Sequence, residues 1–320
     1  RTQYVRTNVN GEDIIIDNPD PHIQVGTGFS QMDLLQKYVA SINENIKAEI
    51  NLQYSTSSDI PRYDNLSERT DGGVGGLRFA EWNYGPQSRL LIAPKLSITG
   101  HNTFFDKAYL ITSFQKIDED RISRRIFSSI TETQKEDVKV WSLTLDFNKR
   151  LNTSQKIIYG IDIHRNDVQS AAFSQVDDNL PAQNILTRYP SGGSQLSNAG
   201  IYIQHNLQNQ DSTLIWITGL RYTTQKVDLN YDRSDPFVWP EYFYNGISST
   251  SSAIVGITGI NYSKNKLTIK ASIGNAFRAP NVDDLAKVRV NGGEVTIPNP
   301  NLTSEKVINS ELTLGYRLDK

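Results

Sequence analysis

Two short stretches decide how this chain is interpreted: Phe277-Arg278-Ala279-Pro280-Asn281-Val282-Asp283-Asp284-Leu285 and, further along, Asn299-Pro300-Asn301-Leu302-Thr303-Ser304-Glu305-Lys306. The first closes an alternation of apolar and polar residues, and the second opens another. Alternation alone carries little information, because any half-buried strand shows it. Two fixed tetrapeptides between two alternating strands, separated by a long loop, form a much more specific pattern.

Alternation with a period of two runs through most of the chain. Near its start, Ala48, Ile50, Leu52 and Tyr54 fall on one face of a strand, and polar residues fall on the other. This is the period of a strand with one apolar and one polar face. Pro94 has no amide hydrogen for a ladder, so the segment around it is the least regular one. We predict about eleven strands, at residues 34–42, 45–56, 88–99, 108–116, 141–148, 157–164, 197–207, 213–227, 253–263, 267–274 and 308–318.

The connections between these strands alternate in length. Short polar turns fall near residues 43–45, 100–102, 150–153, 208–211 and 263–266. Long loops fall near residues 57–87, 117–136, 166–195, 228–252 and 281–305. Such a meander places its turns at one end and its long loops at the other, which is typical of outer-membrane barrels and unusual in soluble sandwiches. Most predicted strands reach the roughly nine to eleven residues that a tilted strand needs to cross a bilayer.

The composition is compatible with a membrane barrel and excludes other classes. The 320 residues are 37% hydrophobic and contain no apolar run long enough for a membrane-spanning helix. A membrane barrel hides its apolar residues at every second position, so this low hydrophobicity does not argue against one. A net charge of −2 without a clustered basic face excludes nucleic acid as a partner. The absence of cysteine excludes disulfides and zinc–cysteine sites.

The two stretches resemble the FRAP and NPNL boxes of TonB-dependent outer-membrane receptors, and the resemblance covers most of the chain. Residues 59–64 and 84–87 are also similar to loop sequences of such receptors from the Bacteroidetes. The resemblance implies an all-β fold, an antiparallel meander of about eleven long strands that is part of a transmembrane outer-membrane barrel of about 22 strands. The residues that match the family motif are Phe277, Arg278, Ala279, Pro280, Asn299, Pro300, Asn301, Leu302 and Glu305.

Because about eleven strands are half of such a barrel, we expect residues 1–320 to be a partial barrel domain that lacks the N-terminal plug and the C-terminal strands. The resemblance implies a location in the outer membrane of a Gram-negative bacterium. It implies as partners outer-membrane lipid, the plug domain of the full-length chain, TonB acting through that plug, and a small-molecule substrate. It implies no cofactor. An open half-barrel exposes two sheet edges and an apolar face, which we expect to associate in the absence of lipid.

No catalytic or metal-binding constellation stands out in the sequence. The four histidines are scattered and lack the spacing of a metal site. The acidic runs at residues 118–120 and 177–178 fall in predicted long loops, and we interpret them as solvated charge because neither has the spacing of a calcium loop. The glycine-rich run at residues 72–76 does not open a helix after a strand, so we interpret it as a flexible loop rather than a phosphate-binding one.

The contents of the long loops narrow the substrate. Haem-importing relatives carry a histidine between the two boxes, whereas residues 281–298 contain none. Haem ligation needs such an axial side chain, so we favour an iron–siderophore type of chelate. The loop aromatics Trp239, Tyr242 and Tyr244 are candidates for packing against a flat or ringed ligand. Arg278 either meets the plug or the substrate, or it only helps to end its strand.

Three functions remain open at this point. The first is energy-coupled import through the outer membrane, with the substrate captured by the long loops; under it, alternation predicts that Ile273 faces lipid and Ser272 faces the lumen. The second is an outer-membrane barrel enzyme such as a lipase or protease, but no nucleophile–base pair is apparent, so we expect no enzyme. The third is a soluble all-β module, for instance a carbohydrate-binding one, which would stay monomeric without detergent.

Overall fold

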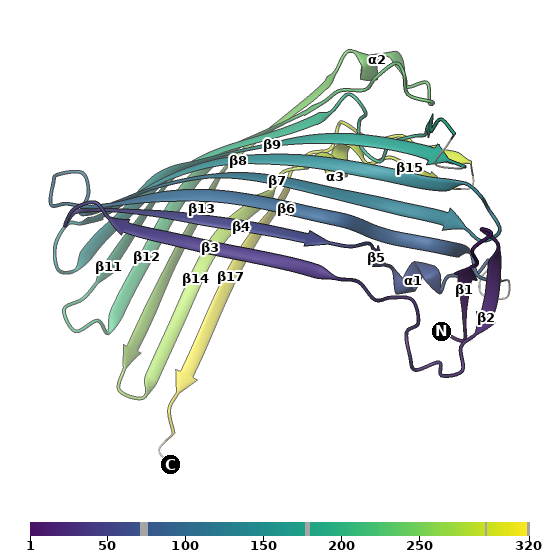
Figure 1. Ribbon diagram of the computed structural model, residues 1–320. Helices are drawn as coiled ribbons and strands as arrows, with labels where there is room; N and C mark the ends of the chain where they lie inside the picture. The colour runs from purple at the N-terminus through teal and green to yellow at the C-terminus, as the bar shows by residue number, and fades with distance from the viewer. Residues whose placement is uncertain (71–75, 177–179, 292, 319–320) are drawn as a thin grey trace.

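The computed structural model describes residues 1–70, 76–176, 180–291 and 293–318, and most of them belong to one open sheet of 13 antiparallel strands (Figure 1). Eleven strands follow one another in chain order, which confirms the all-β fold and the antiparallel meander of long strands. Two short strands, β5 (Ile60–Pro61) and β10 (Gln183–Asn184), pair with β6 and β9. The long strands are β3 (Gln31–Ser41), β4 (Ile46–Ser57), β6 (Phe79–Thr99), β7 (Lys107–Arg125), β8 (Thr131–Arg150), β9 (Gln155–Gln175), β11 (Ser194–Gln208), β12 (Leu214–Leu229), β13 (Ile247–Lys264), β14 (Leu267–Arg278) and β17 (Glu305–Tyr316).

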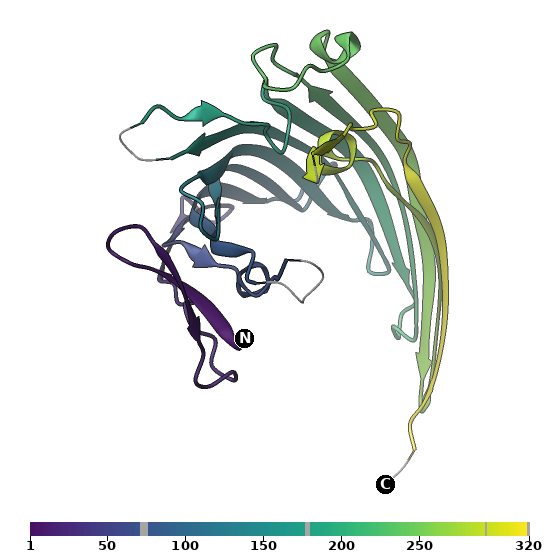
Figure 2. The same cartoon turned by 90° about the vertical axis from the view of Figure 1, so that its right-hand side faces the viewer.

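The remaining elements are small and gather at the end of the sheet where the long loops lie (Figure 1). Figure 2 shows the sheet curving around a concave side, with loops from this end folding toward it. In the described part of the chain, no helix is long and apolar enough to cross a membrane. The small elements are the hairpins β1 (Gln3–Thr7) with β2 (Asp13–Asp17) and β15 (Arg289–Asn291) with β16 (Glu294–Thr296), and the helices α1 (Tyr63–Leu66), α2 (Glu241–Tyr244) and α3 (Val282–Ala286).

One predicted loop is wrong, and three others are shorter than predicted, because β6 begins at Phe79, β9 continues to Gln175 and β13 begins at Ile247. Residues 117–136 are not a long loop, because β7 continues to Arg125, β8 begins at Thr131, and the two strands stay paired from Lys107↔Asn148 to Arg124↔Thr131. The acidic run at residues 118–120 therefore lies in a strand. Charged and polar residues on both faces hide the alternation there, although the backbone pairing continues. Residues 71–75 and 177–179 lie outside the described part of the chain, so the second acidic run and most of the glycine-rich run are not placed.

Pro94 lies inside β6 without breaking the sheet. It pairs with Ile50 of β4, and on its β7 side the ladder runs from Ile92↔Phe114 to Lys95↔Ile111 without a change of register. The missing amide hydrogen therefore interrupts one ladder only locally. The irregularities of β6 lie instead nearer the loops, between Phe79 and Glu81 and between Tyr84 and Gln87.

The register separates an apolar face from a polar face. Leu110, Leu145, Ile161, Ile201 and Tyr222 are successive partners across five neighbouring strands, and they form an apolar row on one face. The next row of partners, one residue away along each strand, lies on the other face. Ile273 belongs to the apolar face. It pairs with Thr258, which lies on the same face of β13 as Ile254, the partner of Tyr222. Ser272 is one residue away and therefore belongs to the polar face. The apolar face is largely exposed in the isolated chain.

Two glycines let long polar side chains lie flat on the polar face. A Cβ atom at Gly160 would lie 2.6 Å from the Tyr202 hydroxyl, and one at Gly200 would lie 2.0 Å from an Arg221 nitrogen. In the space that these glycines leave, the Tyr202 hydroxyl donates to Asp146, and Arg221 forms an ion pair of 2.6 Å with Asp162. The polar face thus carries a continuous network in the middle of the sheet.

The hydrophobic core of the chain lies among the loops rather than within the sheet. Its central side chains are fully buried and come from three segments of the sequence, residues 227–231, 239–243 and 282–288. The core therefore joins the ends of β12 and β13 to the segment that follows β14. Its buried members are Val227, Leu229, Tyr231, Trp239, Phe243, Val282, Leu285, Ala286 and Val288.

Candidate functional site

The first box of the motif is a junction of ion pairs at the end of β14. Arg278 pairs with Asp284 at 2.6 Å and with Glu305 at 2.9 Å, so it joins the end of one strand to a loop helix and to the start of the next strand. The hydrogen bond from Arg278 is the largest cause that lowers the pKa of Asp284 below its ordinary value, and the backbone amide of Asn281 acts in the same direction. Two carboxylates thus hold Arg278 at the end of the sheet where the long loops lie.

The residues after Arg278 start a helix and bury it. Asn281 accepts a hydrogen bond from the Asp284 amide, and Asp284 accepts one from the Asn281 amide, which makes a complete capping box at the start of α3. The carbonyl of Pro280 accepts a 2.8 Å hydrogen bond from Gln225 on β12. Val282 and Leu285 are buried in the loop core. The box therefore ends a strand, turns the chain and fixes the loop on its neighbours.

The second box sets the return into the sheet. The Asn299 side chain accepts a 3.0 Å hydrogen bond from the amide of Asn301, which forms an Asx turn. Glu305, the first residue of β17, pairs with Arg278, and Phe277 pairs with Lys306 in the next register position. The structure brings Arg278 and Glu305 together, while Ala279, Pro300 and Leu302 lie along the connection without a hydrogen-bonding side chain.

The three loop aromatics occupy different surroundings. Trp239 is 3% exposed, stacks on Phe243 at 5.4 Å, and donates from its indole nitrogen to Asp235. The Tyr244 hydroxyl accepts from the Trp239 amide at 2.9 Å. Tyr242, in contrast, is 53% exposed. Trp239 and Tyr244 hold the loop together, whereas the ring of Tyr242 packs on Phe243 at 4.5 Å and leaves its other side exposed. The role of all three in ligand binding stays a prediction.

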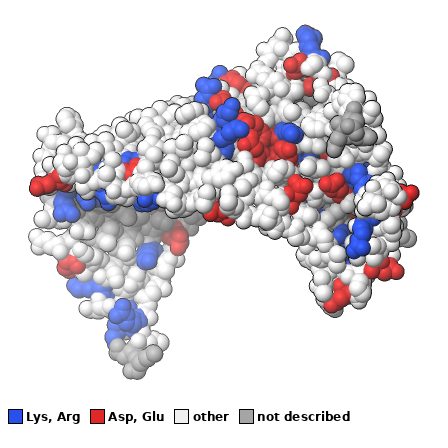
Figure 3. All heavy atoms as spheres, viewed as in Figure 1, with Lys and Arg blue, Asp and Glu red and all other residues white. Residues whose placement is uncertain are grey.

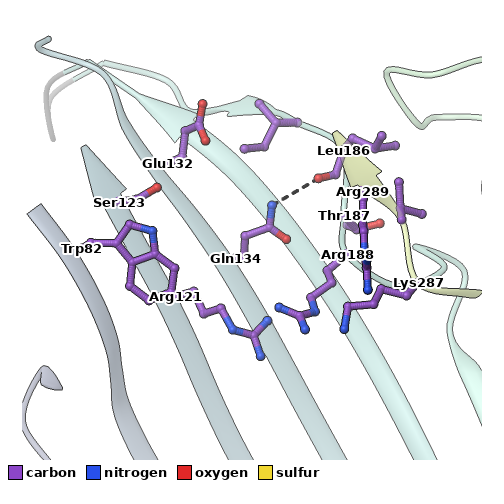
Figure 4. A pocket seen from close by; sticks show the side chains of 12 residues that line it. Trp82, Arg121, Ser123, Glu132, Gln134, Leu186, Thr187, Arg188, Lys287 and Arg289 are labelled. Atoms are coloured by element: carbon purple, nitrogen blue, oxygen red, sulfur yellow. Dashed lines mark hydrogen bonds between the residues drawn. The ribbon is translucent and has the colours of Figure 1, made fainter. Parts of the chain in front are cut away.

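A basic hollow of about 550 Å³ lies where loops cover the polar face near the loop end (Figure 4). Strands β6, β7 and β8 form its wall, and residues 185–188 and 287–289 form its cover. Arg121, Arg188 and Lys287 point toward one another in this space, with the Trp82 ring on the strand side. The lining residues are Trp82, Arg121, Ser123, Glu132, Gln134, Ile185, Leu186, Thr187, Arg188, Lys287, Val288 and Arg289.

The guanidinium groups of the hollow keep hydrogen-bonding capacity for a ligand. Arg121 donates to Glu119 at 2.9 Å and lies 4.0 Å from the carboxylate of Glu136, which is 7% exposed. Among the described residues, Arg121 Nε and Nη1 and Arg188 Nε are buried without a hydrogen-bond partner. Buried donors are normally satisfied, because an unpaired one costs free energy. An anionic group in the hollow would satisfy these donors.

Aromatic rings support the same wall. Tyr84 contacts two guanidinium groups, that of Arg62 at 4.9 Å and that of Arg121 at 5.4 Å from the ring centroid. Trp82 packs edge-on against Tyr84 at 5.1 Å and also lies under Arg62. Sequence reasoning missed this site, because it assigned Arg121 to a loop and because the lining residues are far apart in the chain. The alternating Trp82 and Tyr84 are the signal that it could have used.

A comparison with protein families decides the identity of the fold. The family described as "TonB dependent receptor-like, beta-barrel" matches residues 19–320. The chain belongs to the TonB-dependent receptor family. This confirms the resemblance carried by the two boxes. No curated protein sequence matches the chain.

Solved structures of TonB-dependent receptors share the fold at low sequence identity. The copper transporter OprC superposes with a TM-score of 0.69 at 14% identity, over 91% of this chain and 43% of that one. The ferric citrate transporter FecA, in its unliganded form, gives 0.59 at 10% identity, over 90% and 41%. The hemophore receptor HasR of Serratia marcescens, in complex with its hemophore and heme, gives 0.61 at 10% identity, over 89% and 42%. The chain spans less than half the length of these receptors.

The described residues of this barrel form no metal cage. No group of three or more histidine, cysteine, aspartate or glutamate side chains is arranged to hold a metal ion in the described ranges. The family consists of outer-membrane receptors that take up nutrients, so the basic hollow and the exposed loop ring of Tyr242 are the candidate contacts for a substrate.

Proposed function

We propose that this chain forms part of the wall of an outer-membrane receptor for energy-coupled, TonB-dependent uptake of an iron–siderophore type of chelate. The observation that carries the proposal is the basic and aromatic hollow on the polar face. Four cations line it, namely Arg121, Arg188, Lys287 and Arg289, against one carboxylate, Glu132. Guanidinium groups bind planar anionic groups bidentately, and rings such as that of Trp82 stack on flat ligands.

The same hollow argues for an anionic chelate rather than haem. The neighbouring structures are named for copper, ferric citrate and heme, so fold alone does not select among substrates. None of the described lining residues is a histidine, cysteine, methionine or tyrosine, which are the side chains that ligate haem iron. Several convergent cations instead suit a ligand whose iron is already held by its own anionic groups. We infer transport rather than catalysis, since the family's members are receptors.

The partners of the receptor follow from its faces and edges. We propose that residues 1–320 are a partial barrel domain in the outer membrane of a Gram-negative bacterium. The apolar face would contact lipid, and the polar face would contact the plug domain, through which TonB acts. Every residue of β3 is exposed, and β17 is exposed along nearly its whole length. Unpaired edges of this kind pair with further strands in a closed barrel.

The proposal is tested by chelate binding to the full-length receptor. Arg121→Gln and Arg188→Gln should each weaken binding of a ferric siderophore by about tenfold to hundredfold, because each removes charge-assisted hydrogen bonds. Arg6→Gln is the matched control, since this exposed arginine of β1 lies outside the hollow. Growth of a strain that lacks the receptor gene gives the second readout. If growth on haem as sole iron source collapses while growth on ferric siderophores is untouched, the preference for a siderophore is wrong.

A further inference from the structure

The two loop segments that cover the basic hollow hold each other. The amide of Val288 in one segment donates a 2.9 Å hydrogen bond to the carbonyl of Arg188 in the other. Toward the wall, the Gln134 side chain donates to the carbonyl of Leu186 at the longer distance of 3.3 Å. The places of the two cover cations, Arg188 and Lys287, therefore depend on how the two segments are joined.

One carboxylate joins the two segments a second time. Asp283, in the first turn of α3, accepts a 2.7 Å hydrogen bond from the Tyr189 hydroxyl and lies 2.9 Å from the ammonium group of Lys287. Tyr189 directly follows Arg188 in the chain, and its ring packs against the loop core. Burial acts to raise the pKa of Asp283, but the hydrogen bonds from Tyr189 and Lys287 outweigh it and lower the pKa below its ordinary value. The carboxylate is therefore charged at neutral pH.

This tether matters because it controls two like charges. Arg188 and Lys287 lie beside each other in the hollow and face Arg121 (Figure 4). Like charges repel one another, and a mobile lysine side chain loses entropy when a ligand fixes it. Asp283 itself is not among the residues that line the hollow. Its charge therefore offsets the repulsion from behind and fixes Lys287 in advance, which lowers the cost of binding an anion.

We propose that Asp283 is a positioning residue of the basic hollow, which holds the two cover segments so that Arg188 and Lys287 face the chelate together. The inference rests on the proposed function, because it takes the hollow as the place where the chelate binds. Asp283 does not contact the chelate but acts through Tyr189 and Lys287. The neighbouring carboxylate of Asp284 instead pairs with the arginine at the end of β14. Two adjacent carboxylates of α3 thus serve two different parts of the molecule.

The test measures chelate binding to the full-length receptor in detergent by isothermal titration. The probe is ferric citrate, an iron chelate with anionic carboxylate groups. Asp283→Asn keeps the size of the side chain and removes its charge, so the hollow becomes more positive and attraction alone would tighten the binding of an anion. We expect the opposite, binding weaker by about tenfold, because Lys287 is no longer fixed in advance. Tyr189→Phe keeps the packed ring and removes only one tether, so it should weaken binding by about threefold.

The conservative variant Asp283→Glu distinguishes positioning by charge from a merely structural role. Glutamate keeps a carboxylate within reach of Lys287, four residues along the helix, so its binding should stay within about threefold of the wild type. A merely structural role would give the reverse order, because asparagine matches aspartate in size and glutamate does not. Binding by Asp283→Asn that is as tight as that of Asp283→Glu would overturn the inference.

Two further variants complete the test. Figure 3 shows charged side chains at both ends of the molecule, and the matched control comes from the short-turn end, where Asp106 pairs with Lys149 at 3.0 Å. Asp106→Asn should bind ferric citrate as the wild type does. If Arg121→Gln weakens binding and Asp283→Asn does not, only the inference is wrong. If neither does, or if the wild type itself does not bind the probe, the hollow is not the chelate site and the proposed function fails as well.

Discussion

The loop core and the sheet of this chain bury apolar residues in opposite ways. In the loop core Phe243 is 0% exposed, whereas Ile273 in the sheet is 53% exposed. The loop core excludes water with its own side chains, as a soluble domain does. The sheet leaves its apolar face uncovered, which is the arrangement expected where lipid takes the place of a core. Two parts of one chain are thus built for two solvents.

The largest expected effect tests the loop core. Phe243→Ala should destabilise the packing of the loops by about 3–5 kcal/mol, because it removes a fully buried ring that contacts Tyr231 and Trp239. Hydrogen exchange of residues 229–247 in the full-length receptor measures the loss. Tyr242→Ala is the control, since its ring is exposed and should cost far less. Equal effects of the two substitutions would mean that the loop core does not hold the loops.

The next effect tests the sheet. Ile273→Arg in the full-length receptor should cost about 2–4 kcal/mol in lipid, because it places a charge on the lipid-facing side of the barrel. Ser272→Arg, one residue away, should cost much less because its side chain reaches the lumen. Unfolding midpoints in urea with lipid vesicles measure both. The two faces are wrongly assigned if the midpoints coincide, and a register slip by one residue inverts their order.

The smallest effect concerns the junction between the two regions. The hydrogen bond from Arg278 is the main cause that lowers the pKa of Asp284 in the folded protein. The ionised Asp284 side chain therefore contributes its full stabilisation above its unfolded pKa of about 4. This stabilisation is lost as the pH falls through the lower pKa of the folded state. Protection of the α3 amides, corrected for intrinsic exchange, should therefore decrease below about pH 4. Asp284→Asn should already show the weaker protection at neutral pH. An acid-induced decrease of the same size in the variant would assign the effect to another group.

The sequence predicted the sheet well because alternation is a local property. Each long strand of the meander overlaps one of the predicted segments, and the short turns fall at one end. The sequence did not predict that β7 and β8 continue as a pair to Arg125 and Thr131. Ion pairs such as Lys135 with Asp120 stabilise this part of the hairpin, and charged residues do not produce the apolar alternation by which strands were predicted. The burial of Trp239 was missed because the sequence of a loop does not show whether an aromatic side chain packs against a ligand or against another side chain such as Phe243.

The site was less predictable than the fold, for a physical reason. The hollow brings together Trp82, Arg121, Arg188 and Lys287, which no local pattern connects. Their meeting depends on the fixed register of three strands and on loops that fold back over the polar face. The two boxes were recognisable because capping and ion pairing at the end of a strand need particular residues close together in sequence, as Arg278 and Asp284 show.

Gly160 and Gly200, on which the side chains of Tyr202 and Arg221 lie, determine the inner width of any barrel that this sheet helps to close. Because both side chains lie against the wall, the passage keeps its width at that height while its surface stays hydrated and charged. Alanine at Gly160 would push the Tyr202 ring off the wall, and alanine at Gly200 would do the same to Arg221. Each change would narrow the channel from the side, without touching any residue of the basic hollow. Gly160 and Gly200 therefore determine how wide the channel is at this height, in addition to the polar groups that the wall presents.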